Sequence, residues 1–159
     1  MVIKKFNHIA IMVRNTSESI NFYQDMLGLE YVHGLVFKNS NNQRVFHSFL
    51  ALEDRSCLAL FEIEGNDTYY NQNKILDQHF ALECSKEYVD IIFKKIVNIN
   101  KKRKTNLIKF GFQDHGFVNS FYFNDPSGNW LELTYFCDPW FFSKKNALDE
   151  LKKWEQSKK

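Results

Sequence analysis

Two stretches of the chain begin alike: residues 8–28 read HIAIMVRNTSESINFYQDMLG, and residues 79–96 read HFALECSKEYVDIIFKKI. Each opens with histidine, an apolar residue and alanine, within a short apolar run typical of a strand. Each then passes through serine or threonine into apolar residues at helical spacing, and the first stretch ends at Gly28. Serine or threonine as the cap and glycine just past the end are the usual limits of a helix. The pattern therefore predicts a strand–helix unit that occurs twice.

Three strand-like runs follow each predicted helix. They cover residues 29–36, 45–52 and 57–64 in the first half and 109–112, 117–124 and 130–136 in the second. Asp125-Pro126-Ser127-Gly128 separates the last two runs and has the proline and glycine positions of a type I turn. Each half thus reads as strand, helix and three strands, which predicts an α+β fold.

The expected organisation is one domain over residues 1–142 and a C-terminal helix over residues 143–159. Within the domain we expect module 1 at about 3–64, a linker at 65–75 and module 2 at about 76–136. The C-terminal helix carries Leu148, Leu151 and Trp154 on one face. We expect this face to dock on its own domain, with a partner subunit as the alternative.

Composition excludes several classes of protein. The 159 residues include 21 basic and 19 acidic side chains, too balanced for a dedicated nucleic-acid binder. No segment approaches the roughly 18 apolar residues of a membrane span. The three cysteines are an odd number and lie far apart, which argues against a disulfide framework and favours the cytoplasm. The 16 Phe, 7 Tyr and 3 Trp favour apolar walls, and a small-molecule substrate is the expected partner.

Histidine placement gives the first indication of chemistry. His8 and His79 occupy the same position in the two halves, so their imidazoles converge if the halves pack about a pseudo-two-fold axis. Glu132 lies inside an apolar strand, where a carboxylate is costly unless it is paired or bound to a cation. The matching residue of the first half is Ala59. Two histidines and one carboxylate form the facial triad of Fe(II) sites, a set that also holds Mn, Zn, Ni or Co.

Four segments carry a resemblance to a known family: Asn7–Ala10, Phe22–Leu29, His79–Leu82 and Asp125–Glu132. Over about residues 3–136 the chain resembles the vicinal oxygen chelate superfamily of glyoxalases, bleomycin-resistance proteins and extradiol dioxygenases. The resemblance implies two paired βαβββ modules, a cup-shaped mixed sheet and a homodimer. It also implies a divalent metal, with Fe(II) favoured, on His8, His79 and Glu132. Glyoxalase I uses a fourth protein ligand where this chain has Ala59, which weakens that assignment.

Residues 115–132 resemble more narrowly the signature of type I extradiol dioxygenases. His115 and Tyr122 match the histidine and tyrosine that assist catalysis in that signature. Each has a structural alternative, because Tyr122 suits a strand aromatic and His115 suits a polar loop before a strand.

The resulting functional prediction is an extradiol ring-cleaving dioxygenase that acts on a catechol-like aromatic. Alternatives on the same fold are a glyoxalase-like isomerase or lyase and a thiol transferase. A further alternative is a metal-free binding protein of the bleomycin-resistance type. The residues expected to line the cavity are His47, Ala59, Phe61, Trp130 and Phe136. His47 fits a sheet-surface position equally well.

Overall fold

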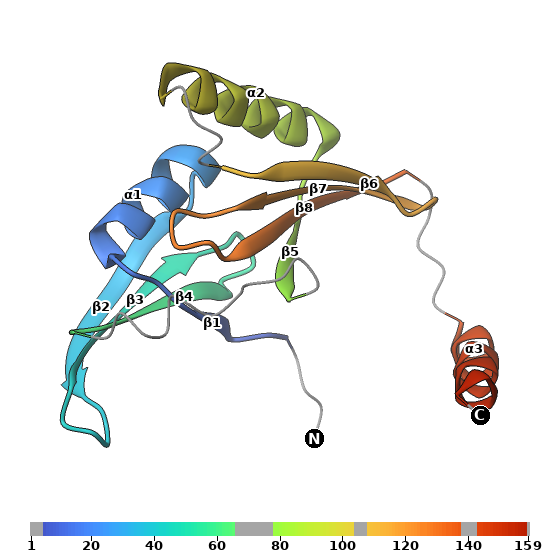
Figure 1. Ribbon diagram of the computed structural model, residues 1–159, viewed down its shortest axis with the longest axis horizontal. Coiled ribbons are helices and arrows are strands. Elements are labelled where there is room, and N and C mark those ends of the chain that lie inside the picture. The colour runs from blue at the N-terminus through green and yellow to red at the C-terminus, as the bar shows by residue number, and fades with distance from the viewer. Residues whose placement is uncertain (1–4, 66–77, 104–107, 138–142, 159) are drawn as a thin grey trace.

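The computed structural model describes residues 5–65, 78–103, 108–137 and 143–158 (Figure 1). In chain order its elements are β1 (His8–Met12), α1 (Thr16–Leu27), β2 (Glu30–Lys38), β3 (Arg44–Ala51), β4 (Cys57–Ile63), β5 (His79–Glu83), α2 (Lys86–Arg103), β6 (Phe110–Asp114), β7 (Val118–Asn124), β8 (Trp130–Phe136) and α3 (Lys144–Ser157). Apart from Gly65, the predicted linker lies outside the described residues.

Each half forms its own four-stranded mixed sheet. The strand orders are β1-β4-β3-β2 and β5-β8-β7-β6, so the first strand of each half lies at an edge beside the last. β1 runs parallel to β4 and β5 runs parallel to β8, whereas the remaining pairs are antiparallel. The predicted α+β fold of two βαβββ units with a C-terminal helix is confirmed. In the described residues the two sheets stay separate.

The helix ends show how local sequence sets the elements. Asn15 is the N-cap of α1, since its side-chain oxygen accepts a hydrogen bond from the Glu18 amide at 2.9 Å. The expected serine or threonine cap is therefore wrong for this helix, although Ser85 does cap α2 through the Tyr88 amide at 3.2 Å. Gly28 ends α1 with a φ of 60°, the left-handed conformation that glycine adopts without strain.

One hydrophobic core joins the two halves. Helices α1 and α2 pack against the sheets, and their buried side chains meet alternate residues of the strands. The core contains Val13, Tyr23, Met26, Leu27, Leu50, Leu58, Leu60, Phe80, Val89, Ile92, Ile96, Ile108, Phe121, Phe123, Leu131 and Leu133. Because strand side chains alternate, the intervening residues occupy the opposite face of each sheet, which we call the open face. The open face of the first sheet carries His8 and His47, and that of the second carries His79 and Glu132.

A polar network also fixes the halves together at the sides that carry the helices. The buried hydroxyl of Tyr23 in α1 donates a hydrogen bond to Asp125 Oδ2 at 2.9 Å. The side-chain amide of Asn129 donates to the Met12 carbonyl at 3.0 Å, and the backbone amide of Arg14 donates to Ser127 Oγ at 3.0 Å. The predicted turn over 125–128 is closed by the Gly128 amide and the Asp125 carbonyl at 2.9 Å. The two open faces therefore belong to sheets that are joined through their covered sides.

Helix α3 stands apart from the rest of the chain (Figure 1). None of its described residues is buried, and Leu148, Leu151 and Trp154 are 49%, 54% and 60% exposed. The expectation that this face docks on its own domain is wrong for the described chain, because the apolar stripe finds no partner surface there. None of the described helices combines the length and the hydropathy needed to cross a membrane.

Candidate metal centre

His79 and Glu132 meet on the open face of the second sheet. Their strands, β5 and β8, are neighbours in which Ala81 pairs with Glu132, so the two side chains lie diagonally on one face. His79 Nε2 lies 2.9 Å from Glu132 Oε2, and the Ser120 hydroxyl donates to Glu132 Oε1. Glu132 is only 8% exposed. A buried carboxylate needs such partners, and this pair presents the nitrogen and oxygen donors that first-row divalent metals prefer.

Tyr122 and His115 lie directly beside this pair. Tyr122 pairs with Glu132 across β7 and β8, and its ring stands perpendicular to that of His79 at 5.2 Å between centroids. His115 Nε2 lies 3.2 Å from the Tyr122 hydroxyl oxygen. Burial and then the charge of Glu132 raise the pKa of Tyr122. Its hydroxyl therefore keeps its proton near neutral pH and can act as a donor.

His8, the third expected ligand, lies on the other sheet. Its Nδ1 is 2.7 Å from the Asn7 side-chain oxygen, an acceptor that places the proton on Nδ1 and leaves Nε2 for a metal. Among the described residues, no group of three His, Cys, Asp or Glu side chains lies close enough to hold a metal ion. A single chain thus brings together two of the three expected donors and holds His8 elsewhere.

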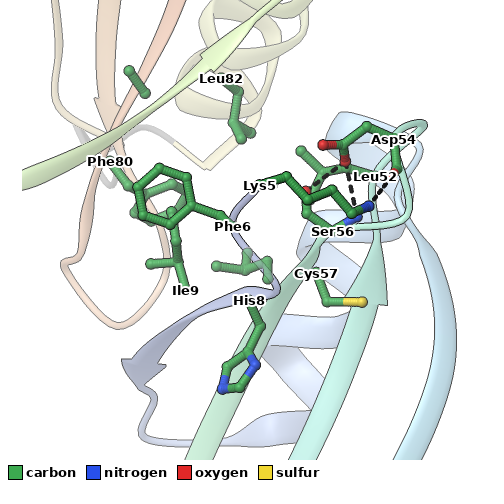
Figure 2. Close-up of a pocket in the computed structure, with 12 residues that line it drawn as sticks. Lys5, Phe6, His8, Ile9, Leu52, Asp54, Ser56, Cys57, Phe80 and Leu82 are labelled. Atoms are coloured by element: carbon green, nitrogen blue, oxygen red, sulfur yellow. Dashed lines mark hydrogen bonds between the residues drawn. The ribbon is translucent and has the colours of Figure 1, made fainter. Parts of the chain in front are cut away.

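A small pocket between the first strands of the two halves shows how His8 is turned. It has a volume of about 260 Å³ and is lined mostly by apolar side chains of β1, β4 and β5. Figure 2 shows the His8 imidazole pointing away from Phe80 and Leu82, two of the three residues that β5 contributes. Lys5 closes one side by donating to the Asp54 carbonyl. Cys57 pairs with His8 in the parallel register of β1 and β4, so it is the thiol next to this imidazole.

His47 belongs to an aromatic cluster on the open face of the first sheet. Its ring stacks on Phe61 at 3.8 Å and 22°, and it lies 4.2 Å from the Phe49 ring. Burial and then the charges of His8 and His33 lower the pKa of His47, and its Nε2 is buried without a hydrogen-bond partner in the described structure. His47 is therefore part of a wall that favours its neutral form.

The other residues expected to line the cavity divide between the two sheets. Ala59 is fully buried between Ala10 and Phe49 in the register of the first sheet. Trp130 and Phe136 share the face of Glu132 by strand alternation. The sequence analysis missed Ser120, which the same alternation places on the face of Tyr122 and which holds the Glu132 carboxylate.

Comparison with known proteins identifies the family. The model of the glyoxalase/bleomycin resistance protein/dioxygenase superfamily matches residues 5–133. The chain belongs to this superfamily. Helix α3 lies beyond the matched region.

Curated members of the superfamily that resemble the chain are metallothiol transferases. The chain is 29% identical over 135 residues to metallothiol transferase FosB of Staphylococcus haemolyticus strain JCSC1435, covering 83% of this chain and 84% of that protein. It is 26% identical over 136 residues to FosB of Staphylococcus epidermidis strain ATCC 12228 / FDA PCI 1200, covering 84% and 82%.

Solved structures share the fold at lower identity. A glyoxylase/bleomycin resistance protein/dioxygenase domain from Frankia sp. EAN1pec has a TM-score of 0.63 at 16% identity, covering 85% of this chain and 99% of that one. The fosfomycin resistance protein FosX from Listeria monocytogenes, a mutant crystallised with Mn(II) and 1S,2S-dihydroxypropylphosphonic acid, has a TM-score of 0.60 at 17% identity, covering 92% and 99%.

The family model shows the superfamily, and the relatives bear on the functional prediction. Their names support the thiol-transferase alternative and give no support to extradiol cleavage as the specific reaction. The divalent metal named with FosX is Mn(II), whereas no relative reported above is named with Fe(II).

Proposed function

We propose that this protein is a metal-dependent enzyme that adds a low-molecular-weight thiol to an electrophilic small molecule, as the names of its FosB relatives suggest. The observation that carries the proposal is the contact of His79 with the buried Glu132 carboxylate at 2.9 Å, beside Ser120 and Tyr122. Fosfomycin-type epoxides are the first substrates to test, because FosX is named a fosfomycin resistance protein. Mn(II) replaces Fe(II) as the preferred metal, because a FosX structure is named with Mn(II).

The third donor of the proposed site is His8 of a second copy. The open faces of the two sheets lie opposite the one core that joins them, so His8 and the His79–Glu132 pair are kept apart within a chain. A homodimer that places the first sheet of one copy against the second sheet of the other completes the set of two imidazoles and a carboxylate. A divalent metal bound there would supply a positive charge that polarises a substrate oxygen.

The chain's own residues have distinct proposed tasks. Ser120 holds Glu132 Oε1, so that Oε2 stays directed at His79. Tyr122 keeps the proton on its hydroxyl and donates it to the oxygen released when the epoxide opens, while His115 Nε2, 3.2 Å away, holds the Tyr122 oxygen in place until water returns the proton. In the balanced step, the thiol loses its proton to water and the thiolate sulfur forms a bond to an epoxide carbon. The C–O bond at that carbon breaks with its electron pair on oxygen, which takes the proton from Tyr122.

Metal uptake and turnover test this proposal together. We expect the full chain to bind Mn(II) with one metal per copy, and His79→Ala and His8→Ala each to abolish tight binding. His33→Ala is the matched control, because His33 is an exposed histidine of the first sheet that is outside the proposed donor set. Stoichiometric Mn(II) binding by His79→Ala would show that the donor assignment is wrong. Absence of a thiol adduct with any epoxide in the Mn(II)-loaded protein would refute the reaction.

Extradiol cleavage remains a second candidate because of one specific contact. His115 and Tyr122, the two residues that match the dioxygenase signature, lie side by side, with His115 Nε2 3.2 Å from the Tyr122 hydroxyl. Oxygen consumption by the Fe(II)-loaded protein with a panel of catechols separates the candidates. Consumption that depends on His115, without thiol adducts, would favour the dioxygenase.

A further inference from the structure

The open face of the first sheet does not carry the charged side chains that bind a phosphonate. By the register of the first sheet, its open face has no lysine or arginine among the described residues. On the second sheet, Lys109 adjoins Asn124 just before β6, and Glu132 presents a carboxylate. A dianionic phosphonate is held in proteins by lysine, arginine or backbone amides, so the open face of the first sheet lacks the side-chain charges that would bind one.

In place of charged side chains, the open face of the first sheet presents a continuous aromatic surface. The His47 ring stacks on Phe61 at 3.8 Å and touches Phe49 at 4.2 Å, and His33 continues the row at 5.8 Å from Phe49. Phe37 meets Phe61 edge-on at 6.4 Å. The row crosses β2, β3 and β4, and it adjoins the proposed metal ligand His8, whose ring is 5.8 Å from Phe49.

The best-packed part of this surface offers ring faces and edges. His47 Nε2 is buried and lacks a hydrogen-bond partner in the described structure, and its ring contacts those of Phe61 and Phe49. Flat rings recognise other flat rings through offset stacking and edge contacts.

We infer that the aromatic row of His33, Phe49, His47 and Phe61 is the substrate-recognition wall of the proposed site, and that it selects an uncharged electrophile bearing a planar aromatic group over a phosphonate. The inference rests on the proposed function for the reaction, in which the thiol sulfur bonds to an epoxide carbon as described above. It adds the chemical class of the group that carries the epoxide.

Two measurements on the full-length Mn(II)-loaded protein test the wall. The first compares thiol-adduct formation from styrene oxide with that from epoxypropylphosphonate, and we expect kcat/KM to be at least about tenfold higher for styrene oxide. The second follows the fluorescence of 2-naphthol, an uncharged flat probe, as it binds. Because one aromatic contact contributes about 0.5–1.5 kcal/mol, Phe61→Leu should weaken 2-naphthol binding by about two- to twelvefold.

Phe112→Leu is the matched control for hydrophobic adsorption. Phe112 is 60% exposed and contacts Phe121 of the core, so it lies on the covered face of the second sheet. Its replacement should leave 2-naphthol binding unchanged. If Phe61→Leu fails to fold by circular dichroism, His47→Leu takes its place with the same expectation.

The outcomes separate the wall from the reaction. The wall would be overturned, and the thiol transfer kept, by either of two results. One is adduct formation with epoxypropylphosphonate alone, and the other is 2-naphthol binding that does not change on replacement of Phe61 or His47. Binding of 2-naphthol that depends on Phe61, without adducts from either epoxide, would support the wall and refute the reaction. Neither binding nor adducts would overturn both.

Discussion

Replacing Tyr23 by phenylalanine removes a single hydroxyl from the contact that links the two halves. The hydroxyl donates to Asp125 Oδ2 at 2.9 Å in a fully buried setting, and its pKa is raised by burial and by Asp125. A hydrogen bond to a charged group contributes about 1.5–3 kcal/mol. Asp125 keeps the amides of Ser127 and Asn129 and the Asn129 side chain as donors, so we expect the lower end, about 1.5 kcal/mol.

Thermal and urea unfolding at one fixed chain concentration measure this effect. For a chain of this size, about 1.5 kcal/mol lowers Tm by about 3–6 °C. Tyr31→Phe is the control, because Tyr31 is 38% exposed on the edge strand β2. A double-mutant cycle with Asp125→Asn should give a coupling free energy of about 1 kcal/mol or more. A Tyr23→Phe protein with an unchanged Tm, or a cycle without coupling, would refute the role of this bond in joining the halves.

Further predictions concern sites away from this contact. Burial and the charge of Glu83 raise the pKa of Cys84 to about 11. At pH 8 iodoacetamide should therefore label Cys84 last and exposed Cys137 first, and Cys84 should gain reactivity as the pH rises toward 11. Mass mapping that finds Cys84 labelled early would contradict this. Asn15→Ala should lower the free energy of unfolding by about 1 kcal/mol through loss of the α1 cap. Asn21→Ala, on the exposed side of the same helix, should not lower it. Ending the chain at residue 142 should change the free energy of unfolding of the remaining chain by less than about 0.5 kcal/mol, because none of the described residues of α3 is buried. A larger loss by urea denaturation would show that α3 is packed.

Periodicity predicted most of the fold because it reflects local requirements. The alternation of Trp130–Phe136 marked one strand with its exact bounds, and helical spacing marked α1 to its C-terminal residue. Asn15 was missed as a cap because Asn, Thr and Ser stand in a row and each can accept the same amide hydrogen bond. The docking of α3 was wrong because an amphipathic pattern identifies an apolar face without identifying its partner.

The candidate site was predictable up to the level of a single sheet. Alternation placed Glu132 on one face of an apolar strand, and the internal repeat matched His79 to His8 and Glu132 to Ala59. The 2.9 Å contact of His79 with Glu132 then follows because β5 and β8 are neighbouring strands. The relation between the two sheets could not be derived in this way. It depends on the core around α1 and α2 and on the Tyr23–Asp125 contact, whose partners are 102 residues apart in sequence. Whether His8 meets the pair within one chain or across two copies was therefore beyond local reasoning, and a second copy is the proposed answer.

Because the two sheets are connected through their covered sides, substitutions on the open face of one sheet can accumulate during evolution without disturbing the other sheet. Substitutions in β2 or β3 alter the row that contains His33 and His47 without touching the packing of His79 against Glu132 on the other sheet. On the proposed function, β2 and β3 set ligand preference, whereas the proposed metal donors lie on β1, β5 and β8. A lineage can then explore new substrates by mutating β2 and β3, while selection on the other three strands preserves the proposed metal site.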